Sequence, residues 1–458
     1  MTALIRLADK LVVAPLVALA GLVQGRRPRA APSPPPAAAG RCVVVKLVGL
    51  GDAVLMLPAL AALRAQPGAE VTVITTRRAA PVFTAPGVTD RVIVIEPRGG
   101  ARRLREAVGA IRAADTVLDF EQHVYWSTLL TLGARRGARR HGFRTASRVR
   151  NRAYDRLVDP GRAPRPMKTI FDELAQSAGV RPKRGLLPLP ASAAARRQAA
   201  AWLEAHGLGA GGYAVLAPGS GASVSFRRLP ASAWAEIAGG LPRAWTVIVA
   251  GTALERELAE EIARRAPRPV TVELEFGLET LACIFAGAAR VIATDSGPMH
   301  LAAAMGAPVT GIFGPDTPQR YGPIGERAGS VWLGLSCSPC NNCWVYREAR
   351  CTNPERYACV RRIGAELVLA AGSGRVAGDG THHDGQHHGA QDGNQNGVDQ
   401  AAARRRAQGQ HDPSANDRAH DAEQNVQQRA VAGTVHDLAR SPAGDQAHDD
   451  PPDQEHGG

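Results

Sequence analysis

The residues best suited to chemistry in this sequence form the run DSGPMH, which begins at Asp295. Asp295 ends an apolar, strand-like run, and its carboxylate can accept hydrogen bonds from the amides of a following turn. Ser296 supplies a hydroxyl, Gly297 has no Cβ, and Pro298 suits a first helical turn, which places His300 beside a helix N-terminus. Free amides and the positive end of a helix dipole favour anions. The run therefore predicts a diphosphate site.

A second run with chemical potential is VVVKLVGLGDAVLMLPALAALRAQ, residues Val43–Gln66. An apolar β-branched stretch precedes a loop opened by Gly49 and Gly51, and Asp52 stands where a helix begins. A carboxylate at this position can act as a general base, because it would lie at the ligand-binding edge of a sheet. The same residue could instead cap the helix.

The elements that position these two runs alternate between strand and helix. The pattern around the first run predicts a strand ending at Thr294, a helix over Leu301–Met305, and a strand over Val309–Phe313. Further strands are expected near the N-terminal run: Val43–Leu47, Val71–Thr75, Arg91–Ile95 and Thr116–Phe120. Such alternation is typical of parallel α/β sheets, which bind ligands at the carboxyl ends of their strands. Both runs should then open toward one cleft.

Together the two runs resemble motifs of glycosyltransferase family 9, the ADP-heptose:lipopolysaccharide heptosyltransferases. GLGDAVLMLPAL is similar to the family pattern LGDxxxxxPAL, and DSGPMHLAAAMGAPV is similar to DTGxMHLAAALGxP. Two segments between them extend the resemblance. SGASVSFRRLP, which starts at Ser220, resembles the stretch containing KRWP and places Arg227 at the lysine position, with Leu229 in place of the aromatic residue. TVIVAGTALEREL resembles the GGxxEREL segment and includes Glu255.

The resemblance implies the GT-B fold, with two Rossmann-like domains facing a cleft. Residues 41–184 would form the acceptor domain and residues 185–371 the nucleotide-sugar domain. The implied reaction is inverting transfer of heptose from ADP-heptose to the Kdo-lipid A inner core, an anionic glycolipid, with no metal and no cofactor. Asp52 would be the catalytic base. The residues implied to bind substrate are Gly51, Ser220, Arg227, Glu255, Asp295, Ser296, Gly297, Met299 and His300.

Two other functions remain open on the sequence alone. A glycosyltransferase of the same fold could use another nucleotide sugar or another glycan acceptor, because the motifs do not contain the specificity pocket. A protein that binds a nucleotide sugar without catalysis would keep the phosphate contacts and have no use for Asp52. Retention of Asp52, both glycine turns and His300 favours an enzyme.

The net charge of +13 is concentrated between Arg135 and Arg165, where eleven arginines face two acidic residues. Such a stretch could contact an anionic acceptor, a membrane or nucleic acid, or could simply be a solvated face. Aromatic residues are not interleaved with these arginines and no nucleic-acid-binding motif is recognisable, so a nucleic-acid partner is disfavoured.

Both ends of the chain differ from the central part. Leu11–Val23 is apolar, too short to span a bilayer comfortably, and flanked by basic residues. It is expected to lie on the cytoplasmic face of the inner membrane or to pack on the N-terminal domain, with residues up to 40 forming a Pro-rich linker. Residues 372–458 contain most of the histidines but no Ile, Phe, Trp or Tyr. This composition predicts a disordered tail, with metal buffering as the alternative.

Five cysteines lie between Cys337 and Cys359, beginning with a CxxCxxC spacing. That spacing alone suggests a zinc or iron-sulfur site. Reduced or mixed thiols and disulfide pairing are the other interpretations, and a cytoplasmic setting disfavours disulfides. The sequence does not decide among them.

Overall fold

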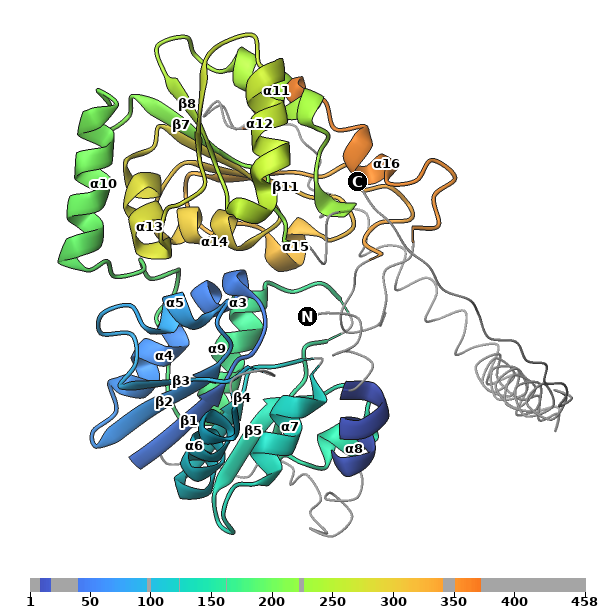
Figure 1. Cartoon of the computed structure of the whole chain (residues 1–458). Helices are drawn as coiled ribbons and strands as arrows, with labels where there is room; N and C mark the ends of the chain where they lie inside the picture. The colour runs from blue at the N-terminus through green and yellow to red at the C-terminus, as the bar shows by residue number, and fades with distance from the viewer. Residues whose placement is uncertain are drawn as a thin grey trace, which may run out of the picture. The chain divides into compact units, whose positions relative to one another are not determined.

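The computed structural model describes residues 9–17, 40–96, 100–122, 124–161, 163–221, 226–340 and 351–371 (Figure 1). The expected disordered tail, most of the expected linker and the second half of the apolar N-terminal stretch lie outside these residues. Secondary structure in the described part follows the predicted alternation of strands and helices.

The first sheet has six parallel strands in the order β3-β2-β1-β4-β5-β6. Its central strand β1 is buried from Cys42 to Val45, as expected for a strand covered on both faces. The chain changes direction in the sheet between β1 and β4, so their carboxyl ends flank a crevice. The strands are β1 (Gly40–Val45), β2 (Ala69–Thr75), β3 (Arg91–Val94), β4 (Thr116–Asp119), β5 (Arg139–Phe143) and β6 (Arg156–Val158).

The second sheet is also parallel and six-stranded, in the order β12-β11-β10-β7-β8-β9. Read from β9, its chain order repeats that of the first sheet, and its crevice lies between β7 and β10. The fold prediction of two parallel α/β sheets is confirmed. The strands are β7 (Tyr213–Ala217), β8 (Thr246–Ala250), β9 (Val270–Glu273), β10 (Arg290–Thr294), β11 (Val309–Ile312) and β12 (Ala328–Val331).

Helices connect the strands and contribute to the core. After β1, α3 stops at Leu55 and α4 begins at Leu57, because Pro58 has no amide hydrogen to continue one helix. The largest buried apolar cluster contains residues from both sheets, such as Val44 of β1 and Val215 of β7. The helices are α3 (Leu50–Leu55), α4 (Leu57–Arg64), α5 (Ala80–Phe83), α6 (Gly100–Ala113), α7 (Tyr125–Leu132), α8 (Arg148–Asn151), α9 (Met167–Ser177), α10 (Ala193–Ala205), α11 (Ala231–Gly240), α12 (Arg256–Arg265), α13 (Leu278–Gly287), α14 (Gly297–Ala304), α15 (Pro318–Tyr321), α16 (Ala358–Arg361) and α17 (Ala365–Ala370).

Residues 9–17 are helical, starting with the π-helical turn η1 (Asp9–Val13). This segment contacts α7 and buries Val13 and Val17 against Leu132 and Tyr154. Its packing on the first domain is one of the two arrangements that the sequence left open. Within the described part of the chain, no helix has the length and apolar character needed to cross a bilayer.

Candidate functional site

Asp52 lies in the first turn of α3, directly after the loop that follows β1. It does not cap this helix: the N-cap is Gly49, at φ +93°, and no side chain bonds the helix N-terminus. Instead, its Oδ2 accepts a hydrogen bond from Lys46 Nζ at 2.8 Å. The carboxylate of Asp52 therefore does not cap the helix, which was the alternative to a catalytic role.

Lys46, which the sequence reasoning did not single out, is the buried cation of this loop. Its Nζ is 2.8 Å from Asp52 and 3.4 Å from Glu121 Oε1, and its side chain is 2% exposed. Burial alone would lower the pKa of Lys46, but the charges of Asp52 and Glu121 outweigh burial and raise that pKa above its ordinary value. Lys46 thus carries a fixed positive charge beside Asp52.

Glu121 fixes the loop from the neighbouring strand. It follows β4, and its Oε1 accepts hydrogen bonds from the amides of Leu47 at 2.6 Å and Val48 at 2.7 Å. β1 ends at Val45, two residues before its predicted end at Leu47, because the amides of Leu47 and Val48 bond the side chain of Glu121. The crevice between β1 and β4 is therefore lined by a Lys46-Asp52-Glu121 cluster.

A second buried network supports Glu121 from behind. The carboxylate of Asp119 accepts hydrogen bonds from the amide of Glu121 at 2.9 Å and from Ser127 Oγ at 2.8 Å. Tyr154 and the guanidinium of Arg150 also bond Asp119, and Arg150 bonds the carbonyl of Glu121. These contacts fix the position of the Glu121 backbone and explain why a charge this deep in the domain is tolerated.

The two principal motifs meet where the N-termini of α3 and α14 touch. A Cβ placed on Gly51 would lie 2.5 Å from Cδ2 of His300, and one placed on Gly297 would lie 2.7 Å from Cδ2 of Leu50. Both positions therefore require glycine for close approach. This contact brings Asp52 close enough to His300 for its charge to affect the pKa of the imidazole.

His300 is buried at the start of α14, with 3% of its surface exposed. Burial lowers the pKa of His300 below its ordinary value, although Asp295 and Asp52 oppose this shift. The ring is therefore neutral near pH 7, and its Nδ1 has no hydrogen-bond partner among the described residues. A buried nitrogen of this kind costs free energy unless a ligand or water bonds it.

Arg227 carries the positive charge on the second sheet's side of the site. One arm of its guanidinium is 2.9 Å from Oδ2 of Asp295, and the other donates to Oδ2 of Asp316 at 3.0 Å. Asp316, which was not predicted, follows β11 and is buried. The fork of an arginine matches two oxygen groups at once, so Arg227 is preoriented at the carboxyl ends of β10 and β11.

Ser220 and Glu255 are joined through Arg228. The guanidinium of Arg228 donates to Ser220 Oγ and to Glu255 Oε1, each at 3.2 Å. Glu255 also accepts from the backbone amide of Thr252, completing a capping box at the start of the following helical turn. Glu255 is thus a structural anchor of the loop, and any contact with a ribose would share its carboxylate with these partners.

Ser296 directly precedes α14, and Met299 lies inside its first turn. Ser296 is the N-cap residue, but its hydroxyl donates to the carbonyl of Thr294 at 2.9 Å and does not bond the helix amides. Met299 is fully buried, and its sulfur packs against Gly311. Met299 is therefore part of the core between α14 and β11, and its contact with substrate stays a prediction.

The cysteine-rich segment is described on both sides of residues 341–350, which contain Cys343. Cys337, Cys340, Cys351 and Cys359 are free thiols. Burial, together with the neighbouring cysteines, raises the pKa of Cys359 to about 11, so this thiol is protonated near pH 7. Among the described residues, no group of three or more Cys, His, Asp or Glu side chains has the arrangement of a metal site.

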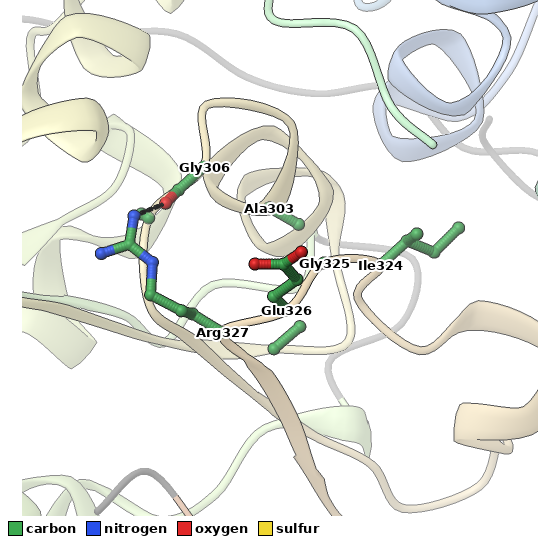
Figure 2. A pocket seen from close by; sticks show the side chains of 8 residues that line it. Ala303, Gly306, Ile324, Gly325, Glu326 and Arg327 are labelled. Atoms are coloured by element: carbon green, nitrogen blue, oxygen red, sulfur yellow. Dashed lines mark hydrogen bonds between the residues drawn. The ribbon is translucent and has the colours of Figure 1, made fainter. Parts of the chain in front are cut away.

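A pocket of about 270 Å³ lies at the C-terminal end of α14, beside Ala303 and Gly306 (Figure 2). Ala303, Gly306, Glu326 and Arg327 line it, and Arg327 donates to the carbonyl of Gly306. The negative end of a helix dipole disfavours a phosphate there. This pocket is separate from the residues predicted to bind substrate.

Comparison with known proteins agrees with this geometry. The sequence profile of glycosyltransferase family 9 (heptosyltransferase) matches residues 101–345, more than half of the chain. A segment of 113 residues is 33% identical to lipopolysaccharide heptosyltransferase 1 of Pseudomonas aeruginosa, covering 24% of this chain and 32% of that protein. A segment of 98 residues is 31% identical to lipooligosaccharide heptosyltransferase 2 of Haemophilus influenzae, covering 20% and 28%. The chain therefore aligns with about a third of the length of these relatives.

Solved structures match over a larger part of the chain. The glycosyltransferase family 9 protein of Veillonella parvula superposes with a TM-score of 0.61 at 22% identity, covering 72% of this chain and 96% of that one. The ADP-heptose lipopolysaccharide heptosyltransferase II of E. coli superposes at 0.56 with 19% identity, covering 72% and 97%. E. coli heptosyltransferase WaaC with ADP gives 0.51 at 24% identity, covering 63% and 92%.

The two parallel six-stranded sheets therefore match the GT-B fold of the solved heptosyltransferase structures. Within that class, the chain belongs to glycosyltransferase family 9, the heptosyltransferase family.

Proposed function

We propose that this protein is an inverting heptosyltransferase that transfers heptose from ADP-heptose to an anionic lipopolysaccharide inner-core acceptor. The observation that supports the proposal is the contact between α3 and α14, which brings the loop of Asp52 up to His300, a residue that we assign to the donor. Residues 41–184 would bind the acceptor and residues 185–371 the donor. Because the acceptor is a glycolipid made inside the cell, the enzyme would act at the cytoplasmic face of the inner membrane.

The proposed chemistry is a single displacement at C1 of the heptose. Asp52 takes the proton of the acceptor hydroxyl while its oxygen bonds C1 from the face opposite the diphosphate. The bond between C1 and the diphosphate oxygen breaks, and ADP leaves with the electron pair, so the configuration at C1 inverts. Lys46 remains paired with Glu121 when Asp52 becomes neutral, and the buried ammonium is therefore never left without a counter-charge.

Charge develops on the leaving ADP, and the donor-side residues are placed to stabilise it. The amides at the N-terminus of α14 favour anionic oxygens, and Arg227 supplies a cation already oriented by Asp295 and Asp316. Nδ1 of His300 can bond a ligand oxygen if the ring carries its proton there. These contacts supply charge stabilisation without a metal, and we expect a chelator to leave transfer intact.

A donor screen tests the proposal. ADP-heptose, UDP-, GDP- and CMP-sugars are each added to the full chain, and the melting temperature and nucleotide release are measured with Kdo-lipid A as acceptor. ADP-heptose should stabilise the protein, by ~2.7 kcal/mol at a hundredfold excess over Kd, and should release ADP only with acceptor. If only a different nucleotide sugar is turned over, the protein is a glycosyltransferase that uses another donor. Stabilisation without turnover would establish a binding protein.

A further inference from the structure

The outer face of the N-terminal helical segment is apolar although it is exposed. Leu11 is 65% exposed and Leu16 46% exposed, and Val12 and Pro15 lie on the same side. The opposite side buries Asp9, Val13 and Val17. A surface helix of a globular protein normally has polar residues outside, so this one has an outer face that the described residues leave uncovered.

The segment is held in a defined orientation. The carboxylate of Asp9 accepts hydrogen bonds from the amides of Tyr125 and Trp126, each at 3.0 Å, and so caps the N-terminus of α7. Val13 and Val17 pack against residues of α7 and of the loop after α8. Trp126, at the start of α7, is 38% exposed beside the segment. The exposed apolar side chains are therefore presented by the domain itself.

Basic residues border this apolar face on α8. Val149 packs into the same cluster as Val13 and Val17, and Arg148 and Arg152 flank it, both exposed. Neither arginine forms an ion pair with a described residue. In Figure 1 the N-terminal segment, in dark blue, lies next to α7 and α8. Other arginines of the basic stretch are different: Arg140 and Arg150 are buried and paired with Asp155 and Asp119.

We infer that this face, formed by Leu11, Val12, Leu16, Trp126, Arg148 and Arg152, docks the protein on a lipid bilayer that contains anionic lipid. Apolar side chains with a tryptophan suit the boundary between headgroups and acyl chains, and arginines with no acidic partner suit anionic headgroups. The inference rests on the proposed function at one point, the membrane that a glycolipid acceptor requires. Vesicle binding is measured without donor, and donor binding without vesicles, so one of the two proposals can be refuted while the other stands.

The test is cosedimentation of the full chain with phosphatidylcholine vesicles, with and without 30% phosphatidylglycerol, in the absence of donor and acceptor. Binding should require phosphatidylglycerol and should weaken with added salt. Leu11→Ser/Leu16→Ser should lower the partition coefficient by about tenfold or more. Arg148→Gln/Arg152→Gln should lower it by about 25-fold, since each arginine near such a surface contributes about fivefold.

Matched controls are available elsewhere in the chain. Leu254 is 65% exposed and Leu367 49% exposed, so Leu254→Ser/Leu367→Ser removes equally exposed leucines away from the face. Arg243→Gln/Arg264→Gln removes two exposed arginines. Neither control pair should change vesicle binding. Equal losses in test and control pairs would overturn the inference, as would a wild-type chain that does not bind vesicles.

Sedimentation velocity separates the other possible occupants of the face. If a second copy of the chain covers it, the wild-type protein will be a dimer that Leu11→Ser/Leu16→Ser converts to a monomer, and the inference fails. If residues 18–39 cover it, the wild-type protein will be a monomer that ignores vesicles, and the inference also fails. Stabilisation by ADP-heptose should be the same in all variants, because the substitutions lie outside the proposed donor site.

Discussion

Replacing Asp52 with asparagine tests the proposed base most directly. The substitution keeps the size of the side chain and its acceptor oxygen but removes the group that would take the proton. Loss of general-base assistance typically slows turnover by about 10²–10⁴-fold. Donor affinity should change little, because Asp52 belongs to the acceptor side and its carboxylate bonds Lys46.

The structure also sets the expected effect on stability. Asparagine at position 52 can still accept a hydrogen bond from Lys46, and Glu121 remains 3.4 Å from the ammonium. Leaving a buried charge wholly unpaired costs ~3–5 kcal/mol, whereas weakening one of two charged partners should cost ~1–3 kcal/mol. The variant should therefore stay folded, with a lower melting temperature.

Asp90→Asn is a matched control for the same measurement. Asp90 forms an ion pair with Arg64 at 2.8 Å, the same distance as Asp52 to Lys46, but lies away from the proposed site. We would measure ADP release and thermal unfolding for both variants and the wild type. Asp90→Asn should lose stability and retain the wild-type rate. Near-wild-type turnover in a well-folded Asp52→Asn protein would remove Asp52 from the mechanism.

Three further predictions follow from the described contacts. Arg227→Ala should weaken ADP-heptose binding and lower kcat by ~10²–10³-fold, and Arg227→Lys should restore part of the loss; unchanged kinetics in the alanine variant would exclude a phosphate contact. Gly51→Ala should destabilise the protein by ~1–3 kcal/mol in chemical unfolding, because its Cβ would meet His300, whereas Gly109→Ala, with open space around it, should stabilise by ~0.5–1 kcal/mol. Burial lowers the pKa of His141 to about 3, so the unfolded ring, with a pKa near 6.5, binds a proton that the folded ring does not. The free energy of unfolding should therefore decrease as the pH is lowered below about 6.5, by ~2 kcal/mol at pH 5. An unchanged pH dependence of stability in His141→Asn would refute this assignment.

Much of the fold was readable from the sequence because its signals are local. The strand predicted over Val309–Phe313 is found at Val309–Ile312, and the strand predicted over Val71–Thr75 lies within β2. Buried parallel strands are continuous apolar runs, and glycine loops mark their ends.

The polar partners of the site were not readable, because they are distant in sequence. Glu121 bonds Leu47 across 74 residues, and Asp316 bonds Arg227 across 89. Neither separation leaves a local pattern, although Lys46 at the end of an apolar strand was a visible anomaly. The roles given to Asp52, Arg227 and the start of α14, including the fully buried Met299, stay predictions.

The arginine-rich stretch shows why charge counts are weak guides to function. Arg140 and Arg150 are buried and bond carboxylates inside the first domain, so part of this charge serves the fold. Arg148, which begins α8, and Arg152, which directly follows α8, face solvent. Composition cannot separate these two groups because both are arginines a few residues apart. Only burial and pairing distinguish them.

The arrangement of strands in the two sheets has a consequence for synthesis of the chain. The six described strands of the first sheet come from residues 40–158, and those of the second from residues 213–331. The first sheet can therefore assemble on the ribosome before the second sheet has been made. α14 is complete at Ala304, 146 residues after position 158, and adding these residues takes ~7–30 s at ordinary translation rates. During that interval Leu50 and Gly51 have no α14 to contact, so the newly made first domain exposes the surface that later joins the two halves of the enzyme.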